Sequence, residues 1–286
     1  MKSFEDKTVV ITGGANGVGR ALGVVFAKEK ANVVLVDIHQ DNLDTTVAEL
    51  GADNVVGMSA DVTDPASMQA LADRCFETYG NVHVLINNAG VGLGEASRPM
   101  WTLPARDWDW GLSVNTTGPV NGIRAFVPRM MESGEECVVV NTSSGNGGIT
   151  SLPTTPIYAA SKAAVTSLTE VLHYQLLKAE SKVRAAVMFP GPNVVNTNIL
   201  NSADSRPDKF TPEGDNKPRS YLSMTELSKN SGLGFALTEP AEVAEYTVEG
   251  IRDGLFWILP PEYGPQLDKL RARTDSICSR RTPGLP

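Results

Sequence analysis

The chain has little cysteine, no long apolar run and no basic tract. Its three cysteines, Cys75, Cys137 and Cys278, are widely spaced and odd in number. They fit neither a disulfide framework nor a zinc-site spacing, and they suit a reducing compartment. No stretch approaches the roughly 18 unbroken apolar residues of a membrane span, and residues 1–7 contain no apolar signal core. We therefore expect a soluble cytoplasmic protein with no membrane partner.

Basic residues and histidines are also scarce. Lysine and arginine number 25 against 33 aspartates and glutamates, a formal charge of −8. Such a chain without a Lys/Arg-rich run is poorly suited to a phosphate backbone, so we expect no nucleic-acid partner. The histidines at 39, 83 and 173 show no metal-ligand spacing, and there is no Gly-x-Ser-x-Gly elbow. We expect neither a metal site nor serine hydrolase chemistry.

What the chain does contain is a regular alternation of short apolar runs and segments of helical period. With 41% hydrophobic residues, its 286 residues suffice for one large α/β domain over residues 1–286. Strands apolar on both faces and separated by helices are typical of a doubly wound parallel sheet, which binds ligands at the carboxyl ends of its strands. We expect seven strands, near 8–11, 32–36, 54–58, 82–86, 137–140, 183–189 and 256–259. Helices are expected near 17–30, 41–50, 67–79, 104–131, 157–179 and 241–252.

Three intervals depart from this alternation. Residues 91–106 hold glycines, prolines and Trp101, and are typical of a loop. Residues 191–238 form a long polar interval with a possible short helix near 220–229. Intervals this long in a compact domain are usually functional, so we expect a mobile lid over a substrate pocket, with a surface excursion as the alternative. Residues 264–286 are expected to form a C-terminal tail.

A glycine-rich turn, TGGANGVG at residues 12–19, joins the first expected strand to the first helix. Glycines permit a tight turn and a close approach of backbone to pyrophosphate. The following helix N-terminus offers free N–H groups and a positive dipole end to the anion. The sequence therefore predicts a dinucleotide site that includes Gly13, Ala15, Asn16, Gly17, Val18 and Gly19.

A carboxylate, Asp37, ends the second expected strand, 18 residues beyond Gly19. This spacing is near that of a group that binds a ribose 2′-hydroxyl. Such a carboxylate repels a 2′-phosphate, and neither Ile38 nor Asn16 supplies a compensating positive charge. The sequence favours NAD(H) over NADP(H), with Asp37 and Ile38 at the ribose; an ordinary turn residue is the alternative.

Tyr158 and Lys162 open an expected helix and share one of its faces, because they are four residues apart. A lysine ammonium near a phenol favours phenolate and lowers the pKa of the tyrosine towards neutrality. A tyrosine tuned in this way can take a proton from an alcohol as hydride leaves, or return it to a developing alkoxide. The pair alone is common, but here it follows the fifth strand of a predicted dinucleotide-binding sheet.

Jointly, these motifs make the sequence resemble the short-chain dehydrogenase/reductase family. The resemblance covers about residues 5–200 and continues more weakly to about residue 260. Besides the glycine loop, it is carried by Asn87-Asn88-Ala89-Gly90, Asn115, Ser144, Tyr158-x-x-x-Lys162 and Pro190-Gly191. It implies a Rossmann-like fold and a homodimer or homotetramer whose long helices, 104–131 and 157–179, pair between subunits.

The resemblance also implies a role for each matching residue. Tyr158 would be the general acid/base, and Lys162 would hold the nicotinamide ribose and depress the tyrosine pKa. Ser144 would hydrogen-bond the substrate oxygen, and Asn115 would anchor a water-linked proton relay. Further NAD contacts would come from Asp61, Val62, Asn88, Ala89, Gly90, Pro190, Gly191, Val194 and Thr197.

Two intervals differ in length from the family pattern. The one from Ser144 to Tyr158 is about one residue longer than usual, which leaves open whether Ser144 or Ser143 reaches the substrate oxygen. The one that follows the sixth strand is about two residues longer, so Thr197 is the better match for a threonine that contacts the carboxamide. Val194 would then supply backbone contacts.

Two further features keep alternative interpretations. Asp61, followed by Asp64, could instead cap a helix. Trp101, Trp108 and Trp110 cluster ahead of Asn115, where they could pack, contact another subunit or touch substrate.

We predict an NAD(H)-dependent alcohol dehydrogenase or ketone reductase. The resemblance is closest to members with the stretch FVPRM at residues 126–130, some of which oxidise benzylic alcohols of lignin-derived aromatics. We therefore expect a bulky aryl or alicyclic secondary alcohol as the small-molecule substrate. The alternatives are an NAD-binding regulator without turnover and an NAD-recycling epimerase or dehydratase. Apolar residues expected to cover the substrate are Leu200, Tyr221, Leu222, Met224, Leu227, Leu233 and Phe235.

Overall fold

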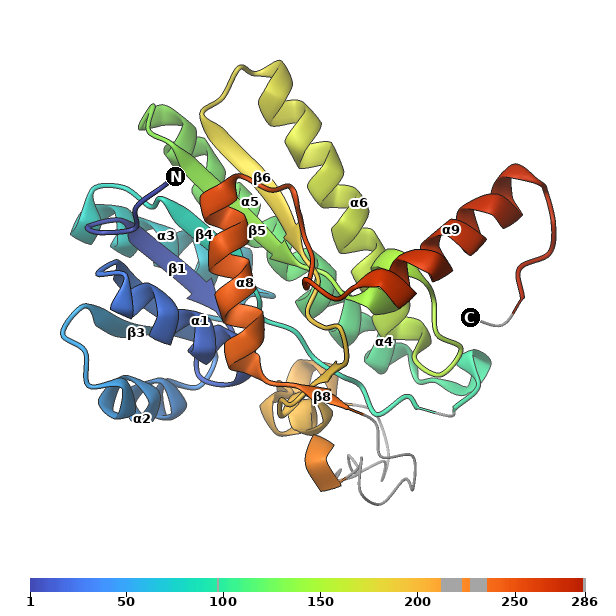
Figure 1. Ribbon diagram of the computed structural model, residues 1–286. Coiled ribbons are helices and arrows are strands. Elements are labelled where there is room, and N and C mark those ends of the chain that lie inside the picture. Colours follow the sequence, from blue (N-terminus) through green and yellow to red (C-terminus); the bar gives the residue numbers. More distant parts are fainter. Residues whose placement is uncertain (97, 212–222, 227–235, 285–286) are drawn as a thin grey trace.

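The computed structural model describes residues 1–96, 98–211, 223–226 and 236–284. Seven parallel strands form one sheet in the order β3-β2-β1-β4-β5-β6-β9 (Figure 1). The predicted doubly wound sheet is confirmed. Its strands are β1 (Thr8–Thr12), β2 (Asn32–Asp37), β3 (Val55–Ser59), β4 (Val84–Asn87), β5 (Cys137–Thr142), β6 (Val183–Met188) and β9 (Trp257–Ile258).

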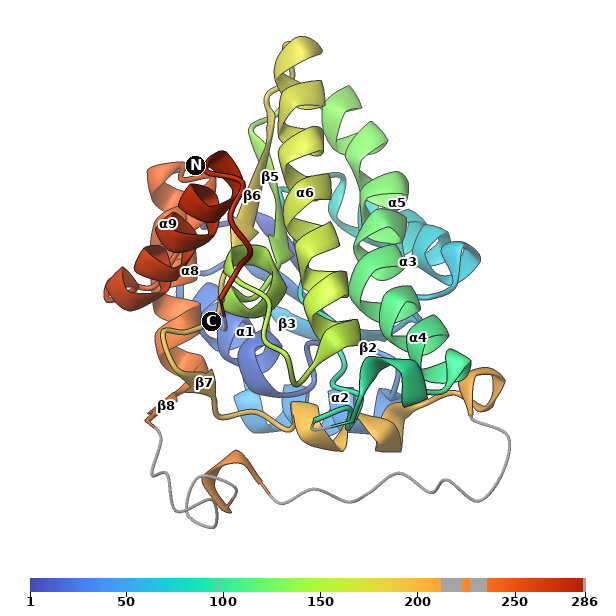
Figure 2. The same ribbon diagram turned by 90° about the vertical axis from the view of Figure 1, so that its right-hand side faces the viewer.

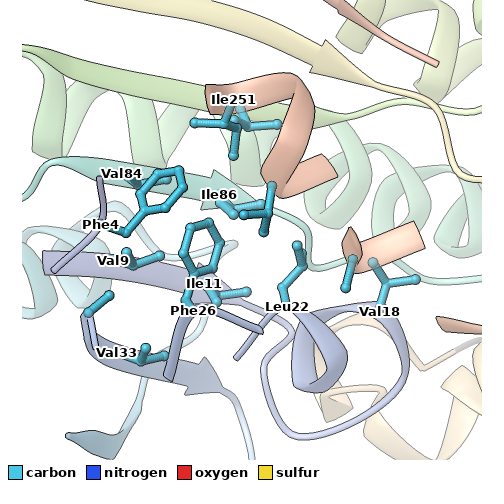
Figure 3. Packing of buried hydrophobic residues seen from close by; sticks show 14 of the residues in the cluster. Phe4, Val9, Ile11, Val18, Leu22, Phe26, Val33, Val84, Ile86 and Ile251 are labelled. Atoms are coloured by element: carbon cyan, nitrogen blue, oxygen red, sulfur yellow. The ribbon is translucent and has the colours of Figure 1, made fainter. Parts of the chain in front are cut away.

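The central strands are apolar on both faces because both faces are covered. Figure 2 shows α1 (Gly17–Lys28) and α8 (Pro240–Asp253) on one side of the sheet, and α3 (Pro65–Tyr79), α5 (Gly118–Glu132) and α6 (Pro156–Lys178) on the other. Val9 and Ile11 pack into the first core with Leu22, Phe26 and Ile251 (Figure 3). Alternate strand residues such as Val10 and Val139 enter the second core. Each fully buried side chain of this size stabilises the fold by roughly 1.5–3 kcal/mol.

Local signals set the helix ends. The Asp64 carboxylate accepts from the Ala66 amide at 2.9 Å, and Pro65 opens α3. Gly51, in the left-handed conformation at φ +57°, ends α2 (Gln40–Leu50). Glu239 and Glu242 form a capping box at the start of α8.

The strand order reverses beside β1, which lies between β2 and β4. The loops that leave β1 and β4 therefore diverge to opposite sides of the sheet and open a crevice at the carboxyl ends of the strands.

The long helix expected over 104–131 is interrupted. The chain forms α4 (Ala105–Leu112), a π-helical turn η2 (Ser113–Thr117) and then α5. The extra residue per turn lies around Asn115, whose side chain is bound to a neighbouring loop as described below. Single π-turns of this kind are rare and are often found at functional sites.

The expected C-terminal tail is mostly helical. Helix α9 (Gly264–Cys278) projects from the body of the molecule (Figure 1) and has no buried residue. It lacks the apolar period by which a helix is predicted from sequence. None of the described helices is long and apolar enough to cross a membrane.

The interval 191–238 is described only in part. It contains β7 (Val194–Val195), which pairs in parallel with β8 (Leu237–Thr238), and the 3₁₀ turns η4 (Ile199–Ser205) and η5 (Asp208–Phe210). Residues 212–222 and 227–235 lie outside the described residues. So do most of the helix expected near 220–229 and the side chains of Tyr221, Leu222, Leu227, Leu233 and Phe235.

Candidate active site

A cleft of about 750 Å³ opens at the carboxyl ends of the strands. It extends from the glycine loop, past the ends of β2, β3 and β4, to the start of α6 and to α9. The predicted site residues that line it are Gly13, Asn16, Gly17, Val18, Asp37, Ile38, Asp61, Val62, Asn88, Ala89, Gly90, Ser144, Tyr158, Lys162, Pro190, Val194 and Thr197. Ala15, Gly19, Asn115 and Gly191 are not among the lining residues.

The glycine loop is closely packed where side chains are missing. A Cβ on Gly19 would lie 2.0 Å from the Gly13 carbonyl oxygen, and one on Gly13, at φ +65°, would lie 2.9 Å from the Ala89 Cα. A Cβ on Gly17, at φ +52°, would lie 3.1 Å from the Thr197 methyl group. The loop thus forms a backbone-walled cradle at the N-terminus of α1, where free amides and the helix dipole favour a phosphate.

Thr12, which the sequence analysis did not single out, joins this cradle to the end of β4. Its hydroxyl accepts from the amides of Asn88 and Ala89, both at 3.0 Å. The Asn88 side chain donates to the Thr12 carbonyl at 3.0 Å. These bonds hold the two cofactor-side loops in register. The available signal was a polar residue at the very end of an apolar strand.

Asp37 faces the cleft at the end of β2. Its carboxylate accepts from the amides of Ala15 and His39, each at 3.4 Å. Ile38, next to it in sequence, and Asn16, in the glycine loop, also line the cleft and carry no charge. A ribose hydroxyl suits this environment, and a phosphate does not.

Asp61 lies after β3, where it accepts from the Thr63 amide at 2.8 Å and from the Thr63 hydroxyl at 2.7 Å. Lys209 donates to its other oxygen at 3.2 Å. Burial alone would raise the pKa of Asp61, but the Thr63 bonds and Lys209 outweigh it, so the pKa is lowered. The helix-capping alternative falls to Asp64, since that residue caps α3.

The structure distinguishes the two serines after β5. The Ser143 hydroxyl is buried and bonded to the Lys162 carbonyl at 2.9 Å and to the Thr166 hydroxyl at 2.7 Å. Ser144 lines the cleft, and its hydroxyl lowers the pKa of Tyr158. Ser144 is thus the serine that faces the cleft.

Tyr158 and Lys162 share the first turns of α6, as their spacing predicts. The Lys162 ammonium donates to the Thr142 carbonyl at 2.8 Å and lies 5.6 Å from the centre of the Tyr158 ring. Burial lowers the pKa of Lys162 to about 8. This cation is therefore itself destabilised in the folded chain.

The pKa of Tyr158 differs from the expectation that lysine lowers it. Burial raises this pKa, the Ser144 hydrogen bond lowers it, and the negative charge of Glu95 raises it further. The net direction is upward in the ligand-free protein. Desolvation of the phenolate exceeds the favourable effect of its neighbours.

Asn115 holds loops together rather than lining the cleft. Its fully buried side chain accepts from the Val91 amide at 2.8 Å and donates to the Val91 carbonyl at 3.0 Å and the Ser161 hydroxyl at 3.2 Å. The amide thus joins the loop after β4 to α6. This explains an asparagine in the middle of a helical segment.

Sequence reasoning missed several residues of the site. Glu95, from the loop after β4, accepts from the amides of Ile157 and Tyr158 at the start of α6. Tyr263, Gln266 and Lys269, at the start of α9, line the cleft near Ser144. A carboxylate inside a predicted loop and polar residues inside a predicted tail carry no periodic signal that would single them out.

Part of the interval 191–238 lines the cleft and is tied to α4. Arg206 pairs with the buried Asp107 at 2.7 Å and stacks 4.8 Å from the Trp110 ring. Leu200 and Met224 line the cleft from this interval. Trp110 is buried and packs there, whereas Trp101 is 87% exposed.

These residues fit a dinucleotide. A Cβ would fill the cradle at Gly13, Gly17 and Gly19, and Asp37 lines the same cleft with a carboxylate that can accept hydrogen bonds. Within the part of the chain that the structure describes, the Thr142 hydroxyl beside Lys162 is the buried side-chain group that lacks a hydrogen-bond partner. It lines the cleft and is available to a bound ligand.

Comparison with known proteins agrees with this geometry. The family model for short chain dehydrogenases matches residues 7–208. The chain is 31% identical over 282 residues to a C alpha-dehydrogenase of a Sphingobium species, covering 97% of this chain and 88% of that protein. It is 30% identical over 277 residues to a CLA biosynthesis dehydrogenase/reductase of Lactiplantibacillus plantarum, covering 94% and 93%.

A solved structure extends the similarity over the whole chain. A short chain dehydrogenase/reductase from Burkholderia phymatum, in complex with NAD, is 34% identical to the chain. It superposes with a TM-score of 0.88 and covers 100% of this chain and 99% of its own. The match over both the fold and the motifs leads to one conclusion: the chain belongs to the short-chain dehydrogenase/reductase family.

Proposed function

We propose that the protein is an NAD(H)-dependent oxidoreductase that moves hydride between the nicotinamide and a secondary alcohol or its ketone. The observation that carries the proposal is that one cleft is lined by Ser144, Tyr158 and Lys162, with the Lys162 ammonium 5.6 Å from the centre of the Tyr158 ring, and also by the glycine cradle. The groups proposed for proton transfer and those proposed for nucleotide binding therefore line the same cleft.

When bound, the nicotinamide would accept or donate the hydride. Gly13, Gly17 and the N-terminus of α1 would hold the pyrophosphate, and Asp37 the adenosine ribose. Lys162 would hold the second ribose, with help from the Thr142 hydroxyl, which has no hydrogen-bond partner among the described residues. These contacts would orient the reacting face towards Ser144 and Tyr158.

Tyr158 would take the proton of the substrate alcohol at its phenolic oxygen during oxidation and return it during reduction. Ser144 would hydrogen-bond the same substrate oxygen. This bond would keep the substrate oxygen on one side of the nicotinamide ring. Lys162 would stabilise the phenolate by its positive charge. Asn115 would keep the loop after β4 in place. It would do so at the end of the site where the water-linked proton relay is expected.

The cofactor preference proposed is NAD(H). Asp37 would repel a 2′-phosphate, and neither Asn16 nor Ile38 would offset that repulsion. The related structure from Burkholderia phymatum, which is in complex with NAD, supports the same preference.

The substrate proposed is bulky and partly apolar, in the aryl or alicyclic class. The apolar residues that line the cleft include Leu93, Leu152, Ile199, Leu200 and Met224. The similarity to a C alpha-dehydrogenase and to 1-deoxy-11-beta-hydroxypentalenate dehydrogenases supports a substrate of this size.

The test is turnover of a panel of secondary alcohols by purified protein with NAD, followed as growth of NADH absorbance. We expect Tyr158→Phe to reduce kcat by roughly 10²–10⁴-fold, and Tyr174→Phe, on an exposed turn of the same helix, to leave it unchanged. Tight NAD binding without turnover would instead indicate a regulator. Product without net NADH would indicate an epimerase or dehydratase.

A further inference from the structure

Glu95 is a buried carboxylate at the start of the helix that carries Tyr158. The side chain comes from the loop between β4 and α4, and the residue is 2% exposed. One carboxylate oxygen accepts from the Ile157 amide at 2.7 Å, and the other accepts from the Tyr158 amide at 2.9 Å. A single carboxylate thus satisfies two of the free amides of the first turn of α6.

The charged groups around Glu95 do not neutralise it directly. Asp107, on α4, is the next carboxylate, and it is occupied by Arg206 at 2.7 Å and Arg98 at 3.7 Å. Among the described residues, the Glu95 carboxylate makes no ion pair. Burial raises the pKa of Glu95, the two amides lower it, and Asp107 raises it further. Its negative charge is held mainly by the amides and the positive end of the helix dipole.

This placement acts on the phenol as well as on the backbone. The positive end of α6 would by itself favour a phenolate on its first turn. A carboxylate seated there cancels that effect, and the charge of Glu95 raises the pKa of Tyr158. Ser144 lowers the pKa of Tyr158, and the Lys162 ammonium lies 5.6 Å from the centre of the Tyr158 ring.

We propose that Glu95 is a positioning residue of the reaction: by accepting from the amides of Ile157 and Tyr158 it fixes the backbone of Tyr158 and keeps a negative charge at that end of α6. The inference rests on the proposed role of Tyr158 as acid/base. While Lys162 is protonated, Glu95 would act in opposition to it: the ammonium favours the phenolate, and the carboxylate delays its formation to higher pH. The two residues together would define the working pH of the enzyme.

Two variants separate charge from position. Glu95→Gln removes the charge and retains one acceptor, so the phenol ionises more readily. In alcohol oxidation, deprotonated Tyr158 is the base, so kcat/KM rises with pH as the phenol ionises. This rising limb of the pH profile is expected to shift to lower pH by about half a pH unit or more. Glu95→Asp keeps the charge but is too short to reach both amides. Its kcat is expected to fall about tenfold through misplacement of Tyr158, with the limb unmoved.

Glu239→Gln is the matched control, because Glu239 also caps a helix, α8, away from Tyr158. It should lower the melting temperature and leave the pH limb in place. The proposal is overturned if Glu95→Gln leaves the limb where the wild type has it, or if Glu95→Asp moves the limb as far as Glu95→Gln does.

A second measurement needs no substrate. The ultraviolet phenolate absorbance is titrated for the wild type and for Glu95→Gln, each with and without Tyr158→Phe, and the difference isolates Tyr158. The Tyr158 titration is expected to lie at lower pH in Glu95→Gln. If that shift occurs without turnover of any alcohol, the proposed function fails and the coupling of Glu95 to Tyr158 stands. An unshifted titration in a folded variant rejects the coupling itself.

Discussion

Individual residues of the cleft owe their chemistry to a few neighbours. Asp37 keeps its carboxylate towards the cleft because the amides of Ala15 and His39 donate to it. Ser143 and Ser144 are adjacent and chemically identical, yet one is bonded inside the core and the other meets Tyr158. At this scale, function depends on which backbone and side-chain groups surround each atom.

Replacing the ribose carboxylate should change the cofactor. In Asp37→Ser/Ile38→Arg, the repulsive charge is lost and a guanidinium that can pair with a 2′-phosphate is gained. The ratio of kcat/KM for NADP to that for NAD is expected to rise by at least about tenfold. Asp41→Ser, on the exposed first turn of α2, is the control. An unchanged ratio would remove Asp37 from cofactor selection.

Burial of Lys162 should make the stability of the ligand-free protein depend on pH. The pKa of Lys162 is lowered from 10.5 to about 8 on folding. Between these values the unfolded chain binds more protons, so the free energy of unfolding rises with pH there. Below pH 8 the fold contains a disfavoured buried charge, which Lys162→Met removes.

We therefore expect Lys162→Met to abolish turnover and yet to raise the free energy of unfolding at pH 7, by about 2 kcal/mol. The gain should shrink towards pH 10, and thermal melts at both pH values test this. Lys178→Met, an exposed lysine of the same helix, should show no such dependence. A lower melting temperature for Lys162→Met at pH 7 would contradict the expectation.

Among the elements, the described part of the interval 191–238 is held by two ion pairs, Arg206–Asp107 and Lys209–Asp61. Arg206, directly after η4, reaches Asp107 on α4 and also donates to the carbonyls of Arg106 and Phe210. Lys209, in η5, reaches Asp61 and Thr63 on the opposite side of the cleft. The interval thereby bridges α4 and the loop after β3.

Removing the arginine should loosen this bridge. Arg206→Met leaves the Asp107 carboxylate buried with only the more distant Arg98 as a cation, at 3.7 Å. Loss of one partner of a buried pair costs roughly 3 kcal/mol or more in the free energy of unfolding. Urea denaturation should show this loss, and the KM for the alcohol should rise as the cover detaches.

The double variant Asp107→Leu/Arg206→Met should recover part of that stability, because no charge is then left unpaired. Arg271→Met, which breaks an exposed pair with Asp268 on α9, should leave stability unchanged. Equal effects of Arg206→Met and Arg271→Met would show that the pair does not fasten the cover.

At the scale of the whole molecule, α6 presents an uncovered apolar stripe. Val171, Tyr174 and Leu177 are 49%, 60% and 62% exposed and recur every three residues. Met131, at the end of the neighbouring α5, is also exposed. Exposed apolar patches of this kind typically mark contacts between chains, so we propose that these two helices pair in a homodimer or homotetramer.

A charge in this stripe should dissociate the oligomer. Tyr174→Glu would place a carboxylate in the proposed helix pair, where its burial without a partner is unfavourable. Light scattering should show a smaller species than the wild type forms at the same concentration. Thr45→Glu, on the exposed face of α2, should leave the mass unchanged. A wild-type mass for Tyr174→Glu would place the interface elsewhere.

The fold followed from patterns that are local in sequence. Val9, Val10 and Ile11 are apolar on successive faces, which only a strand covered on both sides accommodates, and the predicted sheet is confirmed. The glycine turn after β1 could be predicted equally well, because a missing Cβ and a positive φ are local properties. Helix α9 and the π-turn at Asn115 were not, since neither leaves a periodic apolar signal.

The sequence by itself therefore determined the sheet, the cradle and the candidate residues for proton transfer, because apolar periodicity and residue chemistry are present in the chain before it folds. Tertiary structure alone decided which serine faces the cleft, in which direction the pKa values of Tyr158 and Lys162 move, and that Glu95 meets a helix 62 residues further along. Those outcomes depend on burial and on contacts across the molecule. The desolvation penalty of a charged group is set by its surroundings in the folded protein, so it cannot be known from the sequence.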